Sequence, residues 1–406
     1  MTVRYLRLAD VCEINPRLPR THGLVDDDEV SFVPMAAVDE VSGAIKSAEV
    51  RRYAEVKKGY TAFADGDVLF AKITPCMENG KAALVGNLVG GRGFGSTEFH
   101  VLRAGDQVIP DWLRYFVRRE AFRHEAKRNF TGTAGQQRVP ASFLQNALIP
   151  VPSRGEQQRI VDQLSRAEGI VRLRRQAQQK AAELIPAIFV DMFGDPATNP
   201  KGWPEKPVEV LCTVATGATP KRDVQSYYEG GTVPWVKTGE VSAGDVIQAE
   251  ECITELAVAE TNCKVFPAGT ILIAMYGQGQ TRGRVGMLKI PAATNQACAA
   301  ILPSEQVNQT FLFEMLRMQY ERLRAMGRGG NQANLNLGMI KSLCVPVPPL
   351  EAQRAFARHA EALQSIQSQQ TLALQKTTAT FDALLARAFA PEGAAAAIHE
   401  LEEAVS

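Results

Sequence analysis

The chain has 406 residues, of which 45% are hydrophobic and 22% are charged. This composition is typical of a soluble globular protein and excludes disordered and collagen-like chains. At roughly 150 residues per domain, it predicts two or three folded units. Lysine and arginine number 45 against 44 aspartate and glutamate, so the net charge gives no argument for nucleic-acid binding, and any basic surface has to be local.

Membrane insertion and metal binding are not indicated either. No apolar run approaches the ~18 residues needed to cross a bilayer, and the N-terminus lacks a signal-peptide pattern, so we expect a soluble, cytoplasmic protein with no membrane partner. The seven cysteines are scattered and the five histidines are isolated. We therefore expect reduced, mostly buried thiols and no metal site.

The first half of the chain begins with short β-rich runs, such as residues 67–73, separated by glycine, proline and asparagine turns. A short helix is predicted over roughly 111–127, before a glycine-rich stretch at 132–138. A long helical segment follows Pro152, with apolar residues at heptad positions a and d. These positions are Ile160, Leu164, Ala167, Val171, Ala181, Ile185, Ile188 and Met192, with Arg174 and Gln178 in the middle. Pro186 is expected to bend or loosen this helix.

The second half repeats this plan after a linker at 193–203, where glycine, Asp-Pro and Asn-Pro are expected to end the helix and turn the chain. It has β-rich runs such as 270–276, a predicted short helix over roughly 309–326, and a glycine-rich stretch at 327–334. A second long helical segment follows Pro348. Its heptad positions are Phe356, Ala360, Leu363, Leu374, Phe381, Leu384 and Ala388, with Gln367, Gln370 and Thr377 in the middle.

Matching blocks occur in the same order in the two halves, which indicates a tandem duplication. Residues 148–152 and 156–159 match 344–348 and 351–354, and residues 66–71 match 269–274. Both helical seams are apolar at the ends and polar in the middle, which predicts that the two helices pack together as a coiled coil with central layers that fix the register. Two separate amphipathic surface helices are the alternative.

Motifs for catalysis are scarce. A phosphate-binding GxxxxGK[ST] loop and a methyltransferase tetrapeptide of the DPPY or NPPY type are absent from the sequence. Asp111, Glu125 and Lys127 match the PD…ExK pattern of metal-dependent nucleases, whose carboxylates have to surround a divalent ion. Glu125 and Lys127 fall in a predicted helix, two residues apart, and the second half has no counterpart. A nuclease therefore stays only as an alternative.

Local basic and amide residues instead favour DNA recognition. Arginine can pair with guanine or phosphate, and glutamine or asparagine with adenine. The predicted short helices carry Arg114, Arg118, Arg119, Arg123, Lys127 and Arg128 in the first half and Arg317, Arg322, Arg324 and Arg328 in the second. For one copy alone, a solvated cationic helix is the alternative. The candidate DNA-binding residues are Lys72, Thr74, Lys81, Arg92, Arg128, Thr131, Gln136, Gln137, Arg138, Lys221, Arg222, Tyr276, Gln278, Gln280, Arg282, Arg284, Arg328, Asn331, Gln332 and Asn334.

The duplicated Pro-Val-Pro and Glu-x-Gln-Arg entries to long helices, the linker at 192–203 and the C-terminal block 384–389 carry a family resemblance. Together they make the whole chain resemble the specificity subunits of type I restriction-modification systems. The resemblance implies an α+β fold with two β-rich target-recognition domains, at 1–152 and 195–348. A central helix at 153–194 and a distal helix at 349–390 would pack as an antiparallel coiled coil, followed by a C-terminal tail at 391–406.

The same resemblance implies a function without catalysis by this chain. Each target-recognition domain would read one half of a bipartite target in double-stranded DNA. The helices would set the spacer between the half-sites and dock two methyltransferase subunits, and restriction and translocase subunits would join them. S-adenosylmethionine, ATP and magnesium are then expected on the partner subunits, with no cofactor on this chain. A coiled-coil scaffold that binds protein partners is the other alternative.

Overall fold

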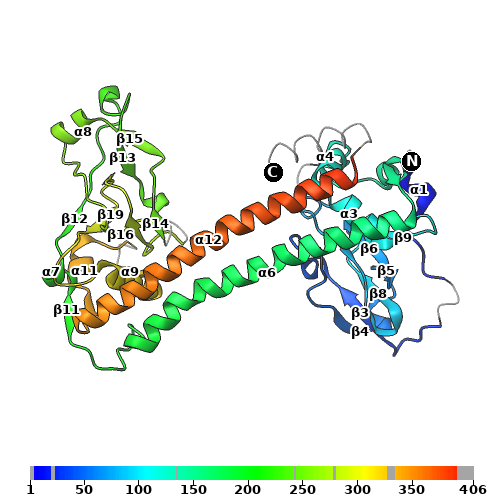
Figure 1. Ribbon diagram of the computed structural model, residues 1–406, viewed down its shortest axis with the longest axis horizontal. Helices are drawn as coiled ribbons and strands as arrows, with labels where there is room; N and C mark the ends of the chain where they lie inside the picture. The colour runs from blue at the N-terminus through cyan, green and yellow to red at the C-terminus, as the bar shows by residue number, and fades with distance from the viewer. Residues whose placement is uncertain are drawn as a thin grey trace. The chain divides into compact units, whose positions relative to one another are not determined.

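The computed structural model describes residues 4–19, 23–133, 136–241, 244–277, 280–326 and 334–390. The chain forms two compact units. The first unit contains residues 1–176 and the residues from 372 onward, and the second contains residues 177–371. Two long helices, α6 (Arg154–Phe193) and α12 (Leu350–Ala388), run from one unit into the other, so each helix contributes one segment to each unit (Figure 1).

The first unit is built on two four-stranded sheets. The sheet β2-β9-β6-β7 is antiparallel, whereas β3 and β8 run parallel in the sheet β4-β3-β8-β5. Strands β1 and β10 form a separate ladder. The strands of the first unit are β1 Arg4–Arg7, β2 Cys12–Ile14, β3 Glu29–Val33, β4 Glu49–Arg52, β5 Thr61–Ala64, β6 Asp67–Ala71, β7 Ala82–Leu84, β8 Arg92–Gly95, β9 Phe99–Ala104 and β10 Leu148–Val151. Its short helices are α1 Leu8–Val11, α2 Tyr53–Val56, α3 Pro110–Arg118, α4 Glu120–Arg128 and α5 Ala141–Asn146, with 3-10 turns η1 Met35–Ala37 and η2 Val89–Gly91.

The second unit has sheets of order β12-β19-β16-β17-β14 and β15-β13-β18, and a ladder of β11 with β20. Its strands are β11 Glu205–Pro207, β12 Val214–Thr216, β13 Val233–Val236, β14 Asp245–Val246, β15 Glu251–Ile253, β16 Ile271–Ala274, β17 Val285–Leu288, β18 Ala293–Thr294, β19 Cys298–Ile301 and β20 Cys344–Pro346. Its short helices are α7 Val208–Leu211, α8 Glu255–Glu260, α9 Gln309–Met318, α10 Tyr320–Met326 and α11 Leu337–Lys341, with 3-10 turns η3 Gln225–Tyr227 and η4 Thr238–Glu240.

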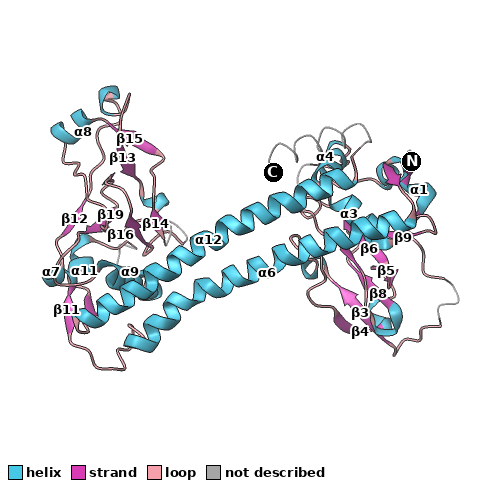
Figure 2. Ribbon diagram, in the orientation of Figure 1, coloured by secondary structure: helices cyan, strands magenta, loops and turns pink. Residues whose placement is uncertain are grey.

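Both units combine strands with short helices (Figure 2), and they share most of their sheet topology, which confirms the predicted duplication. The order β2-β9-β6-β7 recurs as β12-β19-β16-β17, and the parallel pair β3 and β8 recurs as β13 and β18. The matching sequence blocks 66–71 and 269–274 contain the central strands β6 and β16. The α+β fold class is therefore as the sequence predicted.

Alternate residues of the central strands face two different cores, as the two-residue period of a strand requires. In β6, Val68 and Phe70 join a cluster with Trp112 of α3, whereas Leu69 joins a cluster with Phe63 of β5. In β16, Ile271 and Ile273 pack with α9, and Leu272 faces the smaller sheet. A helical layer and a second sheet therefore cover opposite faces of each main sheet.

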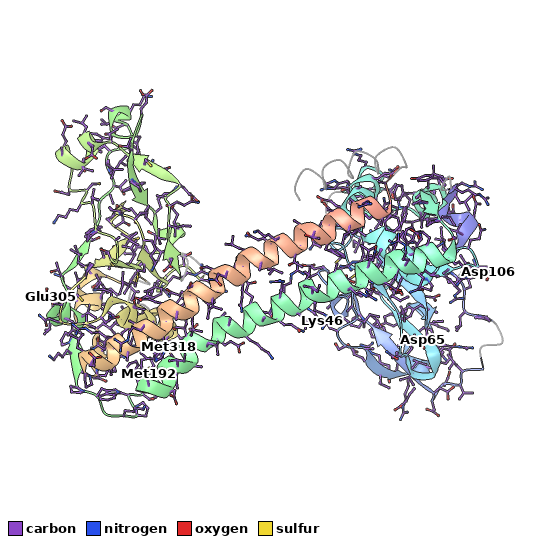
Figure 3. The ribbon with its side chains drawn as sticks, in the orientation of Figure 1. Lys46, Asp65, Asp106, Met192, Glu305 and Met318 are labelled. Atoms are coloured by element: carbon purple, nitrogen blue, oxygen red, sulfur yellow. The ribbon has the colours of Figure 1, made fainter. Side chains whose placement is uncertain are left out.

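The long helices pack against each other within each unit, as predicted. In the first unit, Leu164 near the start of α6 shares a cluster with Leu385 near the end of α12. In the second unit, Phe189 near the end of α6 contacts Phe356 near the start of α12, with ring centroids 5.3 Å apart. The pairing is antiparallel. Met192 of α6 and Met318 of α9 border the second cluster (Figure 3).

The middle of the helix pair is polar, as predicted. Gln178 Nε2 donates to Thr371 Oγ1 at 2.8 Å, and Gln367 Nε2 donates to the Ala181 carbonyl at 2.6 Å. The predicted seam is wrong at Arg174, which is exposed, whereas Arg175 is half-buried. The seam drifts because a helix with 3.6 residues per turn does not keep a 3.5-residue repeat. The chain remains helical through Pro186.

Each predicted short helix is in fact two helices. Arg119 separates α3 from α4 with an extended ψ of 138°, and Gln319 separates α9 from α10. In the first unit, the break lets the half-buried Arg119 lie over the rings of Phe116 and Phe389, 4.2 and 4.8 Å from their centroids. The tertiary contact outweighs the helical pattern of the local sequence.

The linker ends α6 as predicted and is itself ordered by hydrogen bonds. Asn199 has a positive φ of 47° and its side chain binds the backbone of Trp203 at both N and O. Lys201 Nζ donates to the carbonyls of Asp191 and Met192, at 2.7 and 2.9 Å. A cation at a helix C-terminus is favourable because it faces the negative end of the helix dipole.

Candidate nucleic-acid interface

In the first unit, the loop that leaves β6 lies against the glycine-rich loop. The Val139 amide donates to the Lys72 carbonyl at 2.9 Å, and the Thr74 amide donates to the Gln137 carbonyl at 3.1 Å. Ile73 and Arg138 form an isolated β-bridge. This arrangement brings five of the predicted DNA-binding residues to one place. They are Lys72, Thr74, Gln136, Gln137 and Arg138.

The second unit repeats the same backbone pairing. The Leu335 amide donates to the Met275 carbonyl at 3.1 Å, so Met275 takes the position of Lys72 and Asn334 that of Arg138. Lys72 and Met275 in turn donate their amides to Glu98 and Ala297. We call each pair of loops a loop junction: residues 72–74 with 136–139 in the first unit, and 275–277 with 334–335 in the second. The matching sequence blocks predicted where both loops fall in the chain, but not that the loops contact each other.

The first loop junction is charged. Arg138 binds Glu98 with its Nε and Nη2 atoms, each 2.9 Å from a carboxylate oxygen, and its Nη1 donates to the Gln136 carbonyl. The hydrogen bond from Arg138 holds the pKa of Glu98 below its ordinary value. Two-point pairing of this kind fixes the plane of the guanidinium. At the matching positions, the second junction has the neutral residues Ala297 and Asn334.

Glu78 ties the first junction to α4. Its carboxylate accepts from the hydroxyl of Thr74 and forms an ion pair with Lys127, and its carbonyl accepts from Arg123. The hydrogen bond from Lys127 is the main cause that lowers the pKa of Glu78. Neither Glu78 nor Glu98 was among the predicted site residues, because nothing in the sequence separates these two acids from ordinary surface glutamates.

The arginines of α3 serve packing, which corrects the interpretation of this helix as a recognition surface. Arg114 and Arg118 are largely buried and donate to the carboxylate of Glu168 on α6, at 3.1 and 2.5 Å. Tyr115 donates to the same carboxylate at 3.0 Å. Burial by itself would raise the pKa of Glu168, but the two arginines outweigh it and the pKa is lowered. Burial lowers the pKa of Arg119 to about 10.

The remaining first-half candidates lie in different surroundings. Arg128 is exposed at the end of α4, and Thr131 is exposed opposite Arg138. Lys81 donates to the Met35 carbonyl at 3.2 Å. Arg92 begins β8 and is therefore in the other sheet.

Four second-half candidates, Tyr276, Gln280, Arg282 and Arg284, lie in the turn between β16 and β17. Tyr276 is exposed there, and Arg284 donates to the side chain of Gln280 at 3.2 Å. Arg282 lies in the same turn and is partly buried. Gln278, Arg328, Asn331 and Gln332 lie outside the described residues.

Lys221 and Arg222 belong to a different part of the second unit. Lys221 is exposed, whereas Arg222 binds Glu251 at 2.8 Å and lies over Tyr228 and Trp235. Among the second-half arginines of the short helices, Arg317 pairs with the buried Glu314, and Arg322 donates to Gln319.

The duplicated units can be compared with known families. The model of the type I restriction modification DNA specificity domain matches residues 2–183 and again residues 200–377. The chain belongs to this family. Each match of the specificity domain contains one loop junction, so the repeat of the family coincides with the repeat of the candidate interface.

Among curated proteins, the relatives of this chain are named type I restriction enzyme specificity subunits. The type I restriction enzyme EcoEI specificity subunit of Escherichia coli is 40% identical over 163 residues, which cover 40% of this chain and 27% of that protein. The EcoAI subunit of the same species is 40% identical over 155 residues, 38% of this chain and 26% of that protein. The MjaIX subunit of Methanocaldococcus jannaschii is 30% identical over 163 residues, 39% of this chain and 37% of that protein. The matches thus span much less than two thirds of these relatives.

Two solved structures have the same fold as this specificity-domain chain. One is described as the structural basis of complex assembly and conformational transition of the type I R-M system, with a TM-score of 0.61, 21% identity, and coverage of 96% of this chain and 97% of that chain. The other is a type I restriction-modification S subunit from M. genitalium, with a TM-score of 0.58, 14% identity and coverage of 96% of both chains.

The nuclease pattern is not assembled as a metal site in the described parts of this specificity-domain chain. Asp111 is on α3 and accepts from Arg114, whereas Glu125 and Lys127 are on α4 and Lys127 pairs with Glu78. Across the described ranges, histidine, cysteine and acidic residues nowhere gather in threes with the geometry to hold a metal ion. Within the same ranges, every helix is too short or too polar to span a bilayer.

Proposed function

We propose that this chain is the sequence-specific DNA-recognition subunit of a type I restriction-modification complex. Each half would read one part of a bipartite target in double-stranded DNA. The observation that carries the proposal is that the specificity-domain match occurs twice and each match holds a loop junction. We assign the target-recognition domains to residues 1–152 and 195–348, the connecting helices to 153–194 and 349–390, and a tail to 391–406.

The connecting helices would dock two methyltransferase subunits. Each unit exposes large apolar side chains on α6 and α12, and these are available for contact with another protein. In the first unit these side chains are Ile170, Leu173 and Leu372, and in the second they are Leu184, Val190 and Ile366. One such set per unit agrees with two partner subunits. Restriction and translocase subunits would join this complex.

The chemistry would reside on the partners. S-adenosylmethionine is the methyl donor expected on the methyltransferase subunits, and ATP and magnesium are expected on the restriction subunits. This chain would be a non-catalytic subunit without a cofactor, acting on DNA in the cytoplasm. Its near-neutral charge agrees with a complex in which the partners supply much of the phosphate contact, because phosphate neutralisation dominates affinity for DNA.

The function is tested by methylation profiling of genomic DNA from cells that carry this chain and its partner subunits, compared with the same cells without the chain. We expect a bipartite motif with an unspecified spacer that is lost on deletion. If the partner methyltransferase is active but every methylated motif persists without the chain, the proposal is wrong and the scaffold alternative gains support.

The charged loop junction is expected to specify the half-site that the first unit reads. Arg138→Lys keeps the charge but loses the two-point pairing with Glu98 that fixes the plane of the guanidinium. An arginine placed to pair with guanine at two points discriminates against the wrong base by about 1–3 kcal/mol. We expect relaxed methylation at one position of this half-site only. Asn334→Ala is the matched variant and should relax the other half-site. Identical motifs in wild type and both variants would contradict this role of the loop junctions.

The helices are expected to set the spacer length. Seven residues inserted into the polar middle of both α6 and α12 keep the heptad seam and add about 10 Å of helix. At ~3.4 Å per base pair, the spacer should lengthen by about three base pairs while both half-sites stay the same. Methylation profiling measures this directly, and an unchanged spacer in a correctly folded variant would refute the role of the helices as a ruler.

A further inference from the structure

A buried histidine lies beside the first loop junction. His100 is on β9, which pairs with β6 in the main sheet (Figure 1). Its place opposite Phe70 puts it on the face of the sheet that the helical layer covers. Its Nε2 atom lies 2.8 Å from the carbonyl oxygen of Val139, which belongs to the loop junction. The imidazole therefore connects the sheet to the loop that carries Arg138.

Asn15 fixes the protonation of this ring. The Val101 amide donates to Asn15 Oδ1 at 3.0 Å, so the Nδ2 group of Asn15 faces His100. It donates to His100 Nδ1 at 3.1 Å, and the ring hydrogen is therefore on Nε2, from where it is donated to the Val139 carbonyl. Burial is the main cause that lowers the pKa of His100, so the ring is neutral near neutral pH. The single donor of the neutral ring is thus committed to the loop junction.

Glu98 and His100 hold two successive residues of the same loop. Glu98, just before β9, binds the guanidinium of Arg138, and His100 binds the carbonyl of the next residue, Val139. Val139 is 1% exposed, so its carbonyl would lack a partner without this bond. A binding side chain keeps its geometry when a second set of hydrogen bonds supports it. His100 therefore fixes the backbone from which Arg138 projects.

The second unit has alanines at the matching positions. The strand registers place Ala299 at the position of His100 and Ala215 at the position of Asn15. Alanine has no side-chain donor, yet the backbone pairing of the two loop junctions is the same. The common fold therefore does not require the imidazole. It accompanies the junction that ends in an arginine, which indicates a role in how the first unit reads DNA.

We propose that His100 is a positioning residue for base reading by the first unit, because its hydrogen bond to the Val139 carbonyl holds the backbone that presents Arg138 to DNA. This inference rests on the proposed function and adds a residue on which the first half-site depends. A side chain that is positioned before binding loses less entropy when the target arrives. Without the bond, the loop is expected to move so that the carbonyl reaches water, and this displaces Arg138 from its base.

Two matched variants separate the two hydrogen bonds of the ring. His100→Gln keeps an N–H donor in the place of Nε2, whereas His100→Asn keeps an acceptor for Asn15 and loses the donor to Val139. The full chain with its methyltransferase partners is tested by methylation profiling. In His100→Asn, the preference for the correct base at one position of the first half-site should fall by about tenfold, within the range of one two-point contact. The second half-site should stay the same, and His100→Gln should keep the wild-type motif.

Hydrogen exchange supplies a second readout that does not depend on methylation. Exchange of the amides at 136–139 should become faster in His100→Asn and stay as in the wild type in His100→Gln. Val101→Ala is the control for stability, because Val101 is the next residue of β9 and is buried on the other face of the sheet. It should destabilise the first unit by leaving a cavity, without any change in the motif.

Each of three results would overturn the proposal. Unchanged exchange at 136–139 in His100→Asn would show that the bond does not hold the loop. An unchanged motif in that variant, or equal relaxation in both His100 variants, would show that the donor to Val139 does not determine base reading. Relaxation in Val101→Ala would indicate an effect of stability alone. In all three cases the proposed function stands as long as the wild-type motif is lost when the chain is deleted.

Discussion

Glu168→Gln is expected to lower the free energy of unfolding of the first unit by about 3 kcal/mol, because breaking a buried ion pair leaves uncompensated charge. The carboxylate accepts from Arg114, Arg118 and Tyr115, and the two arginine side chains are only 9% and 10% exposed. Glutamine has the same shape but no charge, so Arg118 would stay buried without a counterion and Arg114 would keep only its ion pair with Asp111. Protection against hydrogen exchange in α3 and β6 measures the loss.

The control is Glu183→Gln, an exposed position on the same helix, where we expect a change within about 0.5 kcal/mol. Equal exchange protection in the two variants would show that the Glu168 cluster does not stabilise the unit. Arg118 also donates to the carbonyls of Val41 and Ser42, so the same cluster anchors the loop after β3 against α3.

The stability contributed by Glu168 should depend on pH in a defined direction. Its folded pKa is lowered, so the contribution is complete above the unfolded pKa and is lost as the pH falls through the folded pKa. The difference between wild type and Glu168→Gln should therefore be constant above about pH 5 and close on acidification below that. A difference that grows on acidification would contradict this assignment.

Phe189→Ala is expected to lower the free energy of unfolding of the second unit by about 4 kcal/mol, because it removes a fully buried ring and leaves a cavity. Phe189 is 1% exposed and its ring centroid lies 5.1, 5.4 and 5.3 Å from those of Phe193, Phe311 and Phe356. These rings belong to α6, α9 and α12, so one side chain joins both long helices to the helical layer of the sheet.

Hydrogen exchange should show the loss in β16 and β19, with much less change in β6 and β9 of the first unit. Val190→Ala is the matched control, because Val190 is the next residue of the helix and is 43% exposed. We expect it to leave exchange protection nearly unchanged. Similar losses for the two variants would show that the aromatic cluster is not the main contact of α6 in this unit.

The repeat, the long helices and the linker could be predicted from the sequence because their signals are local or are copied. Blocks such as 66–71 and 269–274 recur in order, and the heptads of α6 and α12 recur every few residues. Turn residues at 194–202 end α6 where the sequence predicted. These features depend on neighbours along the chain, so a single sequence is sufficient to reveal them.

The tertiary structure alone decided which basic residues remain available for DNA. Arg114 and Arg118 look like a cationic helix face in the sequence, but Glu168, fifty or more residues away, neutralises them. The contact of Lys72 with Val139 and the placement of Arg103 beside Asp67 likewise come from strand pairing. The physical reason is that burial and ion pairing are set by long-range packing, whereas periodicity and turn chemistry are set by adjacent residues.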